Sequence, residues 1–143
     1  LALHHAGVDG AADVVRGVAA SFAFTGFVDY AELPEVIERM TVFVAPVWKE
    51  SFGQVGPFAM NMGIPVAGYN VGGVAEIVDD PSLLATPGDS EALAGLVIGL
   101  LDDPARCRAI GARNRDRAQS LFSRESMIRA YRSVYREVLQ TPR

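Results

Sequence analysis

The sequence predicts an α/β fold, a Rossmann-like open parallel sheet followed by three consecutive C-terminal helices. Two observations support this prediction. Over residues 1–85, short apolar runs alternate with longer amphipathic stretches, whereas residues 89–143 have only a helical pattern. Short, wholly apolar runs are typical of parallel strands, which are buried on both faces, and their alternation with helices is typical of an open sheet. The 143 residues amount to about one domain.

Five apolar runs are the expected strands, and most of them end at Gly, Pro or Thr, residues that interrupt regular structure. They are Ala2–Ala6, Phe22–Thr25, Val42–Ala45, Val66–Gly68 and Leu83–Ala85. Four amphipathic stretches lie between them. These expected helices are Ala11–Ala20, Ala31–Met40, Gly56–Met62 and Gly73–Val78.

Capping residues indicate where several of these helices begin and end. Asp29, followed three residues later by Glu32, has the pattern of a capping box and predicts a helix start. Pro57 fits the first turn of a helix. Gly63 follows Met62 at the point where a left-handed C-terminal cap belongs.

Three further helices are expected in the C-terminal part. Asp89 caps the helix Glu91–Leu101, and Pro104 opens a second helix that runs to about Leu121. Ser123 caps the third. One face of this last helix is apolar, and it consists of Met127, Ile128, Tyr131, Val134, Tyr135 and Val138.

The composition excludes several classes of protein. Cys107 is the only cysteine, so no intramolecular disulfide forms, and with His4 and His5 it supplies too few ligands for a metal cluster. No apolar run reaches the roughly 18 residues that a membrane span needs. The first residues have neither an initiator Met nor the basic lead of a signal peptide. We therefore expect a reducing, cytoplasmic location, a chain that begins mid-protein, and neither a metal nor a cofactor.

Charge is distributed unevenly along the chain. Residues 1–103 carry 3 basic and 14 acidic side chains, whereas residues 104–143 carry 10 arginines and 3 acids. Such a cationic end can bind an anionic membrane or nucleic acid. Alternatively, an arginine-dotted helical surface folds back on the acidic part, and we favour this interpretation because the arginines are scattered around the helices. Peripheral membrane contact through these helices remains an expectation, and a nucleic-acid partner is not expected.

The loops that leave the carboxyl ends of parallel strands are where a ligand should bind. The loop of residues 46–55 is the richest in chemistry, since it carries Glu50 and Gly53 just before a helix. Free N–H groups at a helix start, with no side chain at Gly53 to block approach, favour an anion such as a diphosphate. Glu50 would then accept hydrogen bonds from sugar hydroxyls, as a nucleotide sugar would require. The alternative is that Glu50 only complements the helix dipole.

Two other loops are candidates at the same edge of the sheet. Gly72 and Gly73 form a strand-to-helix turn, and their missing side chains allow either close approach of a ligand or simply a tight turn. Phe27 and Val28 would offer an aromatic wall and backbone groups to a base, although an isolated Phe is more commonly a core residue. The residues alone leave these alternatives open.

Five blocks of sequence, taken in order, resemble one large family. They are residues 24–28, 42–46, 50–53, 59–66 and 71–78, which read FTGFV, VFVAP, ESFG, AMNMGIPV and VGGVAEIV. These blocks are similar to successive blocks of the C-terminal domain of the retaining GT-B glycosyltransferases, which include many bacterial mannosyl-, glucosyl- and galactosyltransferases. Each block alone is unspecific, whereas five in order over nearly the whole chain are specific.

This resemblance implies roles for individual residues. Glu50 matches the first acid of the family's paired-glutamate motif, which contacts hydroxyls of the donor sugar. The turn at Phe27 and Val28 matches the base pocket. The residues that match the helix start facing the sugar and diphosphate are Phe52, Gly53, Gln54 and Val55. No residue matches a catalytic base, because in such enzymes the leaving phosphate is held to assist while the protein orients the donor and stabilises charge.

Two departures from the family pattern concern binding. The second glutamate of the motif, which holds the ribose hydroxyls, falls on Phe58, whose ring cannot accept those hydrogen bonds. The family's domain also begins one strand and one helix earlier, with the Arg and Lys that grip the diphosphate, and Lys49 matches neither. Residues 1–143 are therefore expected to be a single, N-terminally truncated donor-binding domain that lacks the acceptor-binding N-terminal domain.

The expected function is that of the donor-binding half of a retaining glycosyltransferase in polysaccharide biosynthesis. It would move a sugar from a nucleotide diphosphate sugar to a glycan or lipid-linked acceptor, and these 143 residues alone would be inactive. One alternative, prompted by Phe58, is a pseudoenzyme or binding module of the same fold. A second alternative is a GT-B nucleotide-sugar epimerase.

Overall fold

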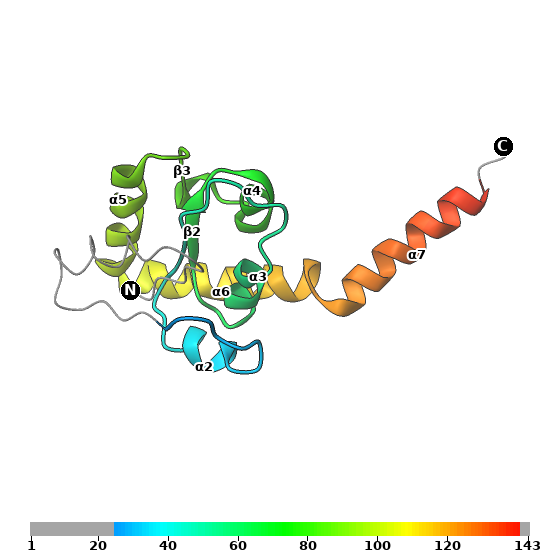
Figure 1. The fold of residues 1–143 in the computed structure, drawn as a ribbon, viewed down its shortest axis with the longest axis horizontal. Coiled ribbons are helices and arrows are strands. Elements are labelled where there is room, and N and C mark those ends of the chain that lie inside the picture. The colour runs from blue at the N-terminus through cyan, green and yellow to red at the C-terminus, as the bar shows by residue number, and fades with distance from the viewer. Residues whose placement is uncertain (1–24, 141–143) are drawn as a thin grey trace. The chain divides into compact units, whose positions relative to one another are not determined.

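The structure, a computed structural model, describes residues 25–140 (Figure 1). It divides the chain after Met40 into two units, and each unit is described by itself. The expected strand Ala2–Ala6 and the expected helix Ala11–Ala20 lie outside the described residues, as does the expected strand Phe22–Thr25 apart from Thr25.

The described part of the first unit contains one helix, α2 (Leu33–Ile37), which is shorter than the expected helix Ala31–Met40. The prediction that Asp29 caps it is wrong. The Asp29 carboxylate accepts from the Ala31 N–H at 3.1 Å, and so it closes a turn ahead of the helix. The helix begins later because Pro34 fits only a first helical turn and has no N–H to offer to a preceding turn.

The second unit holds a parallel sheet of three described strands in the order β1-β2-β3. The strands are β1 (Phe43–Ala45), β2 (Val66–Tyr69) and β3 (Leu84–Ala85), all within a residue of the expected runs. All four residues of the middle strand β2 are buried, as a strand with a neighbour on each side and both faces covered should be. The parallel α/β architecture is thereby confirmed for this unit.

Helices connect the strands and make up the C-terminal part, and their bounds lie close to those expected from the sequence. They are α3 (Val55–Asn61), α4 (Gly72–Val78), the short 3₁₀ helix η1 (Pro81–Leu83), α5 (Ser90–Leu101), α6 (Pro104–Leu121) and α7 (Arg124–Gln140). Gly63 has a positive φ of 79° directly after α3, which confirms the expected left-handed cap. Asp89 caps α5 by accepting from the Ala92 N–H at 2.9 Å, also as expected.

One buried cluster of the second unit lies between the sheet and α5. It joins β2, β3 and α5 through Ala67, Tyr69, Ala85 and Leu93. On another side α6 packs closely along α3 (Figure 1). Gly111 of α6 permits this approach, because a Cβ there would overlap the carbonyl oxygen of Gly63.

Three of the five arginines of α6 bind the acidic part of the chain, as the favoured interpretation of the scattered arginines expects. Arg115 donates to the carbonyl oxygens of Asn61 and Met62 at the end of α3, at 3.3 and 2.9 Å. Arg117 donates to those of Ile77 and Glu76 at the end of α4, at 3.0 and 2.7 Å. Two ion pairs add to these contacts, Arg113 with Asp80 and Arg117 with Asp79. One helix therefore holds the C-terminal ends of two others.

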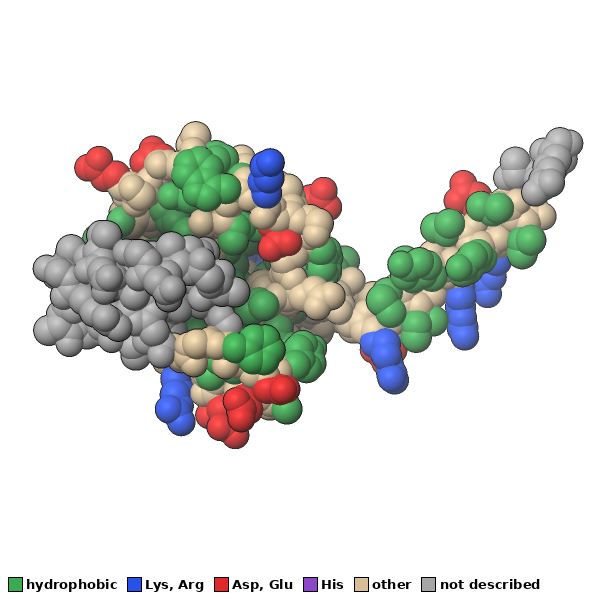
Figure 2. All heavy atoms as spheres, in the orientation of Figure 1, with side chains coloured by type: hydrophobic (Ala, Val, Ile, Leu, Met, Phe, Trp, Pro, Cys, Tyr) green, Lys and Arg blue, Asp and Glu red, His purple; other side chains and the backbone are tan. Residues whose placement is uncertain are grey.

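Helix α7 differs from α6, since none of its residues is buried. Ser123 caps it as expected by accepting from the Ser126 N–H at 3.2 Å. Hydrophobic side chains follow one side of α7 and arginines another (Figure 2). Among the described residues, no helix is long and apolar enough to cross a membrane.

Candidate functional site

The candidate site lies where β1 and β2 end and α3 and α4 begin. The loop of residues 46–54 leads from β1 to α3, and a two-residue turn leads from β2 to α4. Because the strands are parallel, both connections leave the same edge of the sheet, the edge at which open α/β sheets bind ligands. The structure therefore places the loop that carries Glu50 beside the turn that carries Gly72 and Gly73.

The contact between these two connections is close. The Gly73 N–H donates to the carbonyl oxygen of Glu50 at 3.4 Å. A Cβ at Gly72 would overlap that same oxygen, and a Cβ at Gly73 would lie 2.5 Å from the carbonyl oxygen of Ser51. Both glycines are thus needed so that the turn can lie against the loop, and this protein contact accounts for their missing side chains.

The Glu50 carboxylate folds back onto the loop residues just before α3, Ser51 and Gly53. Its Oε1 accepts from the Ser51 N–H at 2.9 Å. Its Cγ and Cδ lie 3.0 and 3.4 Å from the position that a Cβ at Gly53 would take. Gly53 has a φ of +73°, which glycine adopts without strain. The carboxylate is held at the mouth of the loop through Oε1, and a carboxylate oxygen such as Oε2 can accept from a hydroxyl group.

The residues after Glu50 diverge in their surroundings. Phe52 is 47 % exposed, and its ring meets the edge of Phe122, just beyond the end of α6, at a centroid distance of 6.0 Å. Gln54 is exposed and precedes α3 without capping it through its side chain, and Val55 is half-buried. The loop is thereby tied through Phe52 to the same helix that holds the ends of α3 and α4.

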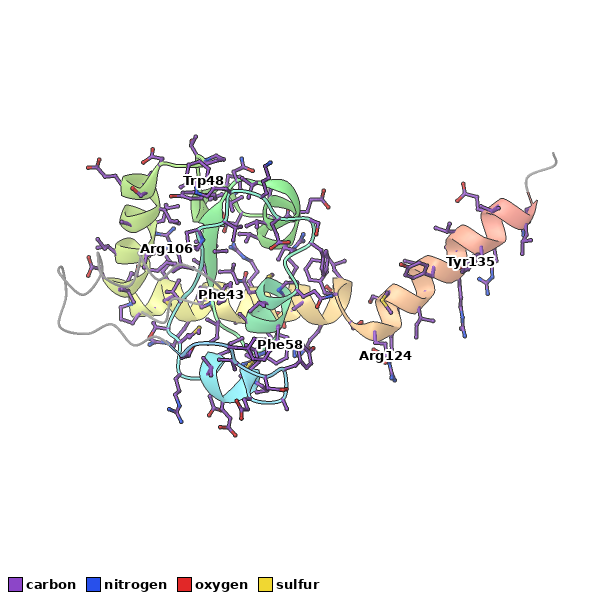
Figure 3. The ribbon with its side chains drawn as sticks, in the orientation of Figure 1. Phe43, Trp48, Phe58, Arg106, Arg124 and Tyr135 are labelled. Carbon is purple, nitrogen blue, oxygen red and sulfur yellow. The ribbon has the colours of Figure 1, made fainter. Side chains whose placement is uncertain are left out.

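Phe58 lies on α3 and is half-buried, whereas its neighbours Pro57 and Ala59 are buried. The described ring partner of Phe52 is Phe122. Whether Phe58 faces the ribose site or the core beside Phe52 stays a prediction. Phe58 and Trp48 lie well apart, one on α3 and the other near the end of β2 (Figure 3).

The two residues expected at the base pocket belong to the first unit. Phe27 is 90 % exposed, so the alternative of a core Phe is wrong, and Val28 is half-buried. The structure describes that unit by itself, and their approach to Glu50 stays a prediction.

Trp48 is a site residue that the sequence analysis missed. It is the single tryptophan of the chain and stands two residues before Glu50, a signal that could have drawn attention to it. Its side chain is 69 % exposed. The indole lies against Gly88, where a Cβ would approach Cη2 to 2.7 Å, and its centroid is 6.0 Å from that of Tyr69.

A hollow of about 480 Å³ lies next to this site, beyond the end of β3. Its lining includes Asn70, Asp80 and Thr86, and none of the expected site residues. We therefore build the site on the contacts of Glu50. Among the described residues, no cluster of His, Cys, Asp and Glu could hold a metal ion.

Comparison with known proteins identifies relatives of this chain. Residues 2–103 match the family model described as glycosyl transferases group 1. A 2-deoxystreptamine glucosyltransferase of Streptomyces kanamyceticus is 42 % identical over 97 residues, which are 66 % of this chain and 25 % of that protein.

Solved structures share the fold. A sucrose-phosphate synthase from Thermosynechococcus elongatus superposes with a TM-score of 0.81 at 32 % identity, over 90 % of this chain and 33 % of that one. The Anabaena protein HepE, in complex with UDP and glucose, superposes with a TM-score of 0.76 over 89 % of this chain and 35 % of its own. Its identity is 23 %, so this likeness concerns the fold alone. The chain spans about a quarter to a third of the length of these proteins.

Proposed function

Because the chain belongs to group 1 of the glycosyl transferases, we propose that it is the donor-binding half of a retaining enzyme of that group. The enzyme transfers a sugar from a nucleoside diphosphate sugar to a glycan or lipid-linked acceptor in polysaccharide biosynthesis. The observation that carries this proposal is the position of Glu50, held between the first turns of α3 and α4 at the carboxyl edge of the sheet.

Glu50 binds the donor sugar in this proposal. A carboxylate accepts hydrogen bonds from hydroxyls, and the fold of the loop around Gly53 fixes its direction before the sugar arrives. The neighbouring residues that complete the sugar and diphosphate site are Phe52, Gly53, Gln54 and Val55. No side chain acts as a general base, because the leaving phosphate accepts the acceptor's proton and the protein contributes orientation and charge stabilisation.

The nucleoside is held by Phe27 and Val28 at the base and by Phe58 at the ribose. Phe58 offers an apolar surface instead of the hydrogen bonds of a carboxylate, and burial against the ribose or base recovers part of their free energy. The same residue favours a second candidate, a pseudoenzyme or binding module that has lost normal donor binding. Affinity for a nucleoside diphosphate separates the two.

Residues 1–143 form one donor-binding domain of a longer chain in this proposal, and they are inactive alone. The chain covers 25 % of the glucosyltransferase that it resembles, so the acceptor site falls to parts of the enzyme that are not in this sequence. Transfer is therefore measured on a full-length protein that contains these residues.

We further propose that the enzyme works in the cytoplasm and that α7 rests on an anionic membrane surface. Its apolar face is exposed along the helix, with Tyr131 and Tyr135 at 61 and 65 %. Arg129, Arg132 and Arg136 recur at spacings of three and four and so share a flank beside that face. An amphipathic helix of this kind binds anionic lipid through both surfaces.

The membrane proposal is tested by sedimentation with vesicles. The protein should sediment with phosphatidylglycerol vesicles and not with phosphatidylcholine vesicles, and Arg129→Gln with Arg132→Gln should reduce sedimentation. The pair Arg106→Gln and Arg108→Gln on α6 is the control. Equal sedimentation of both double variants contradicts a role for α7.

The donor-site proposal is tested with Glu50→Gln in the full-length enzyme, using UDP-glucose, UDP-N-acetylglucosamine and GDP-mannose as donors. The rate of transfer should fall because the activation free energy rises by roughly 1.5–3 kcal/mol, the size of a charged hydrogen bond. Stability should barely change, because the glutamine carbonyl can still accept from Ser51. Lys49→Gln, one residue away and exposed, should leave transfer near the original rate. Unchanged transfer by Glu50→Gln removes Glu50 from the donor site.

A further inference from the structure

Trp48 is large, apolar and mostly exposed, yet it is held in place on one side. Gly88 has a φ of +86° and lies so close to the indole that a Cβ there would come within 2.7 Å of Cη2 and 3.1 Å of Cζ3. Tyr69, itself only 5 % exposed, lies behind the indole at a tilt of 51°. The rest of the indole faces outward, and the whole residue is 69 % exposed.

The position of Trp48 relates it to Glu50. Trp48 leans on Tyr69, the last residue of β2, while the backbone of Glu50 lies against Gly72, three residues further on. Trp48 and Glu50, both from the loop of residues 46–54, therefore lie against the two residues that flank the β2–α4 turn, Tyr69 and Gly72. A ligand that binds Glu50 at this edge therefore meets a loop that also carries the indole of Trp48, two residues earlier.

We propose that the outward surface of Trp48 is a stacking platform for the pyranose ring of a sugar, next to the hydroxyl-binding carboxylate of Glu50. This inference rests on the proposed function and adds a subsite to it. Pyranose rings carry C–H groups along one face, and these pack favourably on the electron-rich face of an aromatic ring. Equatorial hydroxyls at the rim of the same ring are free to reach a carboxylate.

The support behind the indole makes it suited to this task. A side chain that is already immobilised loses little rotamer entropy when a ligand binds, so more of the contact energy appears as affinity. Gly88 provides that support through its missing side chain, which gives glycine at this position a role beyond its positive φ. The pyranose can be that of the donor sugar or that of a glycan acceptor, and the experiment distinguishes the two.

The test combines calorimetric titration with tryptophan fluorescence on the full-length protein. The probes are UDP-glucose, UDP-N-acetylglucosamine and GDP-mannose, each compared with UDP or GDP, and methyl α-glucoside added to the UDP-bound protein. The fluorescence difference between the original protein and Trp48→Phe isolates the emission of Trp48, whatever other tryptophans a longer chain contains.

A donor platform predicts that a nucleotide sugar changes Trp48 emission while its parent nucleotide does not. An acceptor platform predicts the change with methyl α-glucoside instead. In either case Trp48→Ala should weaken binding of that sugar about tenfold and Trp48→Phe much less, with affinity for UDP or GDP unchanged. Gly88→Ala, which displaces the indole, should weaken binding of the same sugar and leave binding of the nucleotide unchanged.

Two results overturn the inference. If nucleotide sugars bind and Glu50→Gln weakens them, but neither Trp48 emission nor Trp48→Ala responds to any sugar, the platform is absent and the proposed function stands. If no nucleotide or nucleotide sugar binds the original protein, the proposed function fails and the platform fails with it.

Discussion

The carbonyl oxygen of Glu50 occupies the space that a Cβ atom at Gly72 would need, and it also accepts from the Gly73 N–H. The backbone of the loop before α3 is thus fitted to the first turn of α4. The direction of the Glu50 side chain depends on this fit, because the backbone of the same residue makes the contacts with Gly72 and Gly73.

Gly72→Ala should destabilise the protein by about 2–3 kcal/mol. The new Cβ overlaps the Glu50 carbonyl, and the φ of +41° is strained for alanine. Urea denaturation measures the change. Gly95→Ala is the matched control: it lies inside α5 with no atom within 4 Å of its Cβ position, and it should stabilise by about 0.5–1 kcal/mol. If Gly72→Ala unfolds with the original midpoint, the two connections do not touch as described.

Arg117→Lys should cost about 1–2 kcal/mol in stability despite keeping the charge. The guanidinium donates to Ile77 and Glu76 carbonyls and pairs with Asp79 at 2.9 Å, three partners that one ammonium cannot reach together. Hydrogen exchange over residues 72–78 should accelerate in the variant. Arg106→Lys, exposed on the same helix, should change neither quantity, and protection of α4 that survives Arg117→Lys would rule out this anchoring.

Stability should depend on Asp80 in acid. Burial alone would raise the pKa of Asp80, but hydrogen bonds from Ser82 and the pairing with Arg113 outweigh it and hold that pKa below its usual value. A carboxylate whose pKa is lower in the folded state stabilises the fold above its unfolded pKa and loses this contribution as pH falls through the folded value. Asp80→Asn should therefore flatten the fall in unfolding free energy between about pH 5 and pH 2.

The comparison for this prediction is Asp116→Asn, which removes an exposed carboxylate from α6. This variant separates the loss of the Ser82 and Arg113 contacts from the loss of one negative charge. Curves for Asp80→Asn that run parallel to those of the original protein at every pH would contradict a lowered Asp80 pKa.

Phe58→Glu should tighten binding of UDP or GDP about tenfold, which is about 1.4 kcal/mol. Phe58 is only half-buried, so a carboxylate there need not be buried. In the proposed function it would accept hydrogen bonds from the ribose hydroxyls. Calorimetric titration and a thermal melt are run together, with Asn61→Glu as a control that adds the same charge at the other end of α3, outside the proposed donor site. A destabilised Phe58→Glu protein with no gain in affinity favours the pseudoenzyme.

Predictions from sequence succeeded where neighbouring residues decide the structure. Asp89 and Ser123 cap the helices that follow them, and Gly63 adopts the left-handed conformation after α3. Each of these features depends on hydrogen bonds or sterics within a few residues. The order of apolar runs likewise predicted the parallel strands, because a strand that will be buried on both faces consists almost wholly of apolar residues.

Predictions failed where one local signal outweighed another, and they were missing where residues distant in the sequence meet. Asp29 has the pattern of a helix cap, but the helix starts at the later position that Pro34 permits. The fit of Gly72 to the Glu50 carbonyl and the support of Trp48 by Gly88 join segments that lie 22 and 40 residues apart in the sequence. Composition and periodicity do not reveal which distant residues meet, so the geometry of the site could not be predicted without the structure.

The hydrogen bonds from α6 to the ends of α3 and α4 limit the order in which the domain can fold on the ribosome. Arg115 lies 53 residues after Met62, and Arg117 lies 41 residues after Glu76. Until α6 has been synthesised and has left the exit tunnel, the last carbonyl groups of both helices lack their guanidinium partners. A nascent chain that stops short of Arg115 therefore contains every residue of the Glu50 loop but not the clamps that fix the helices behind it. Such arrested chains should be cleaved by proteases within α3 and α4 until the remainder of α6 emerges.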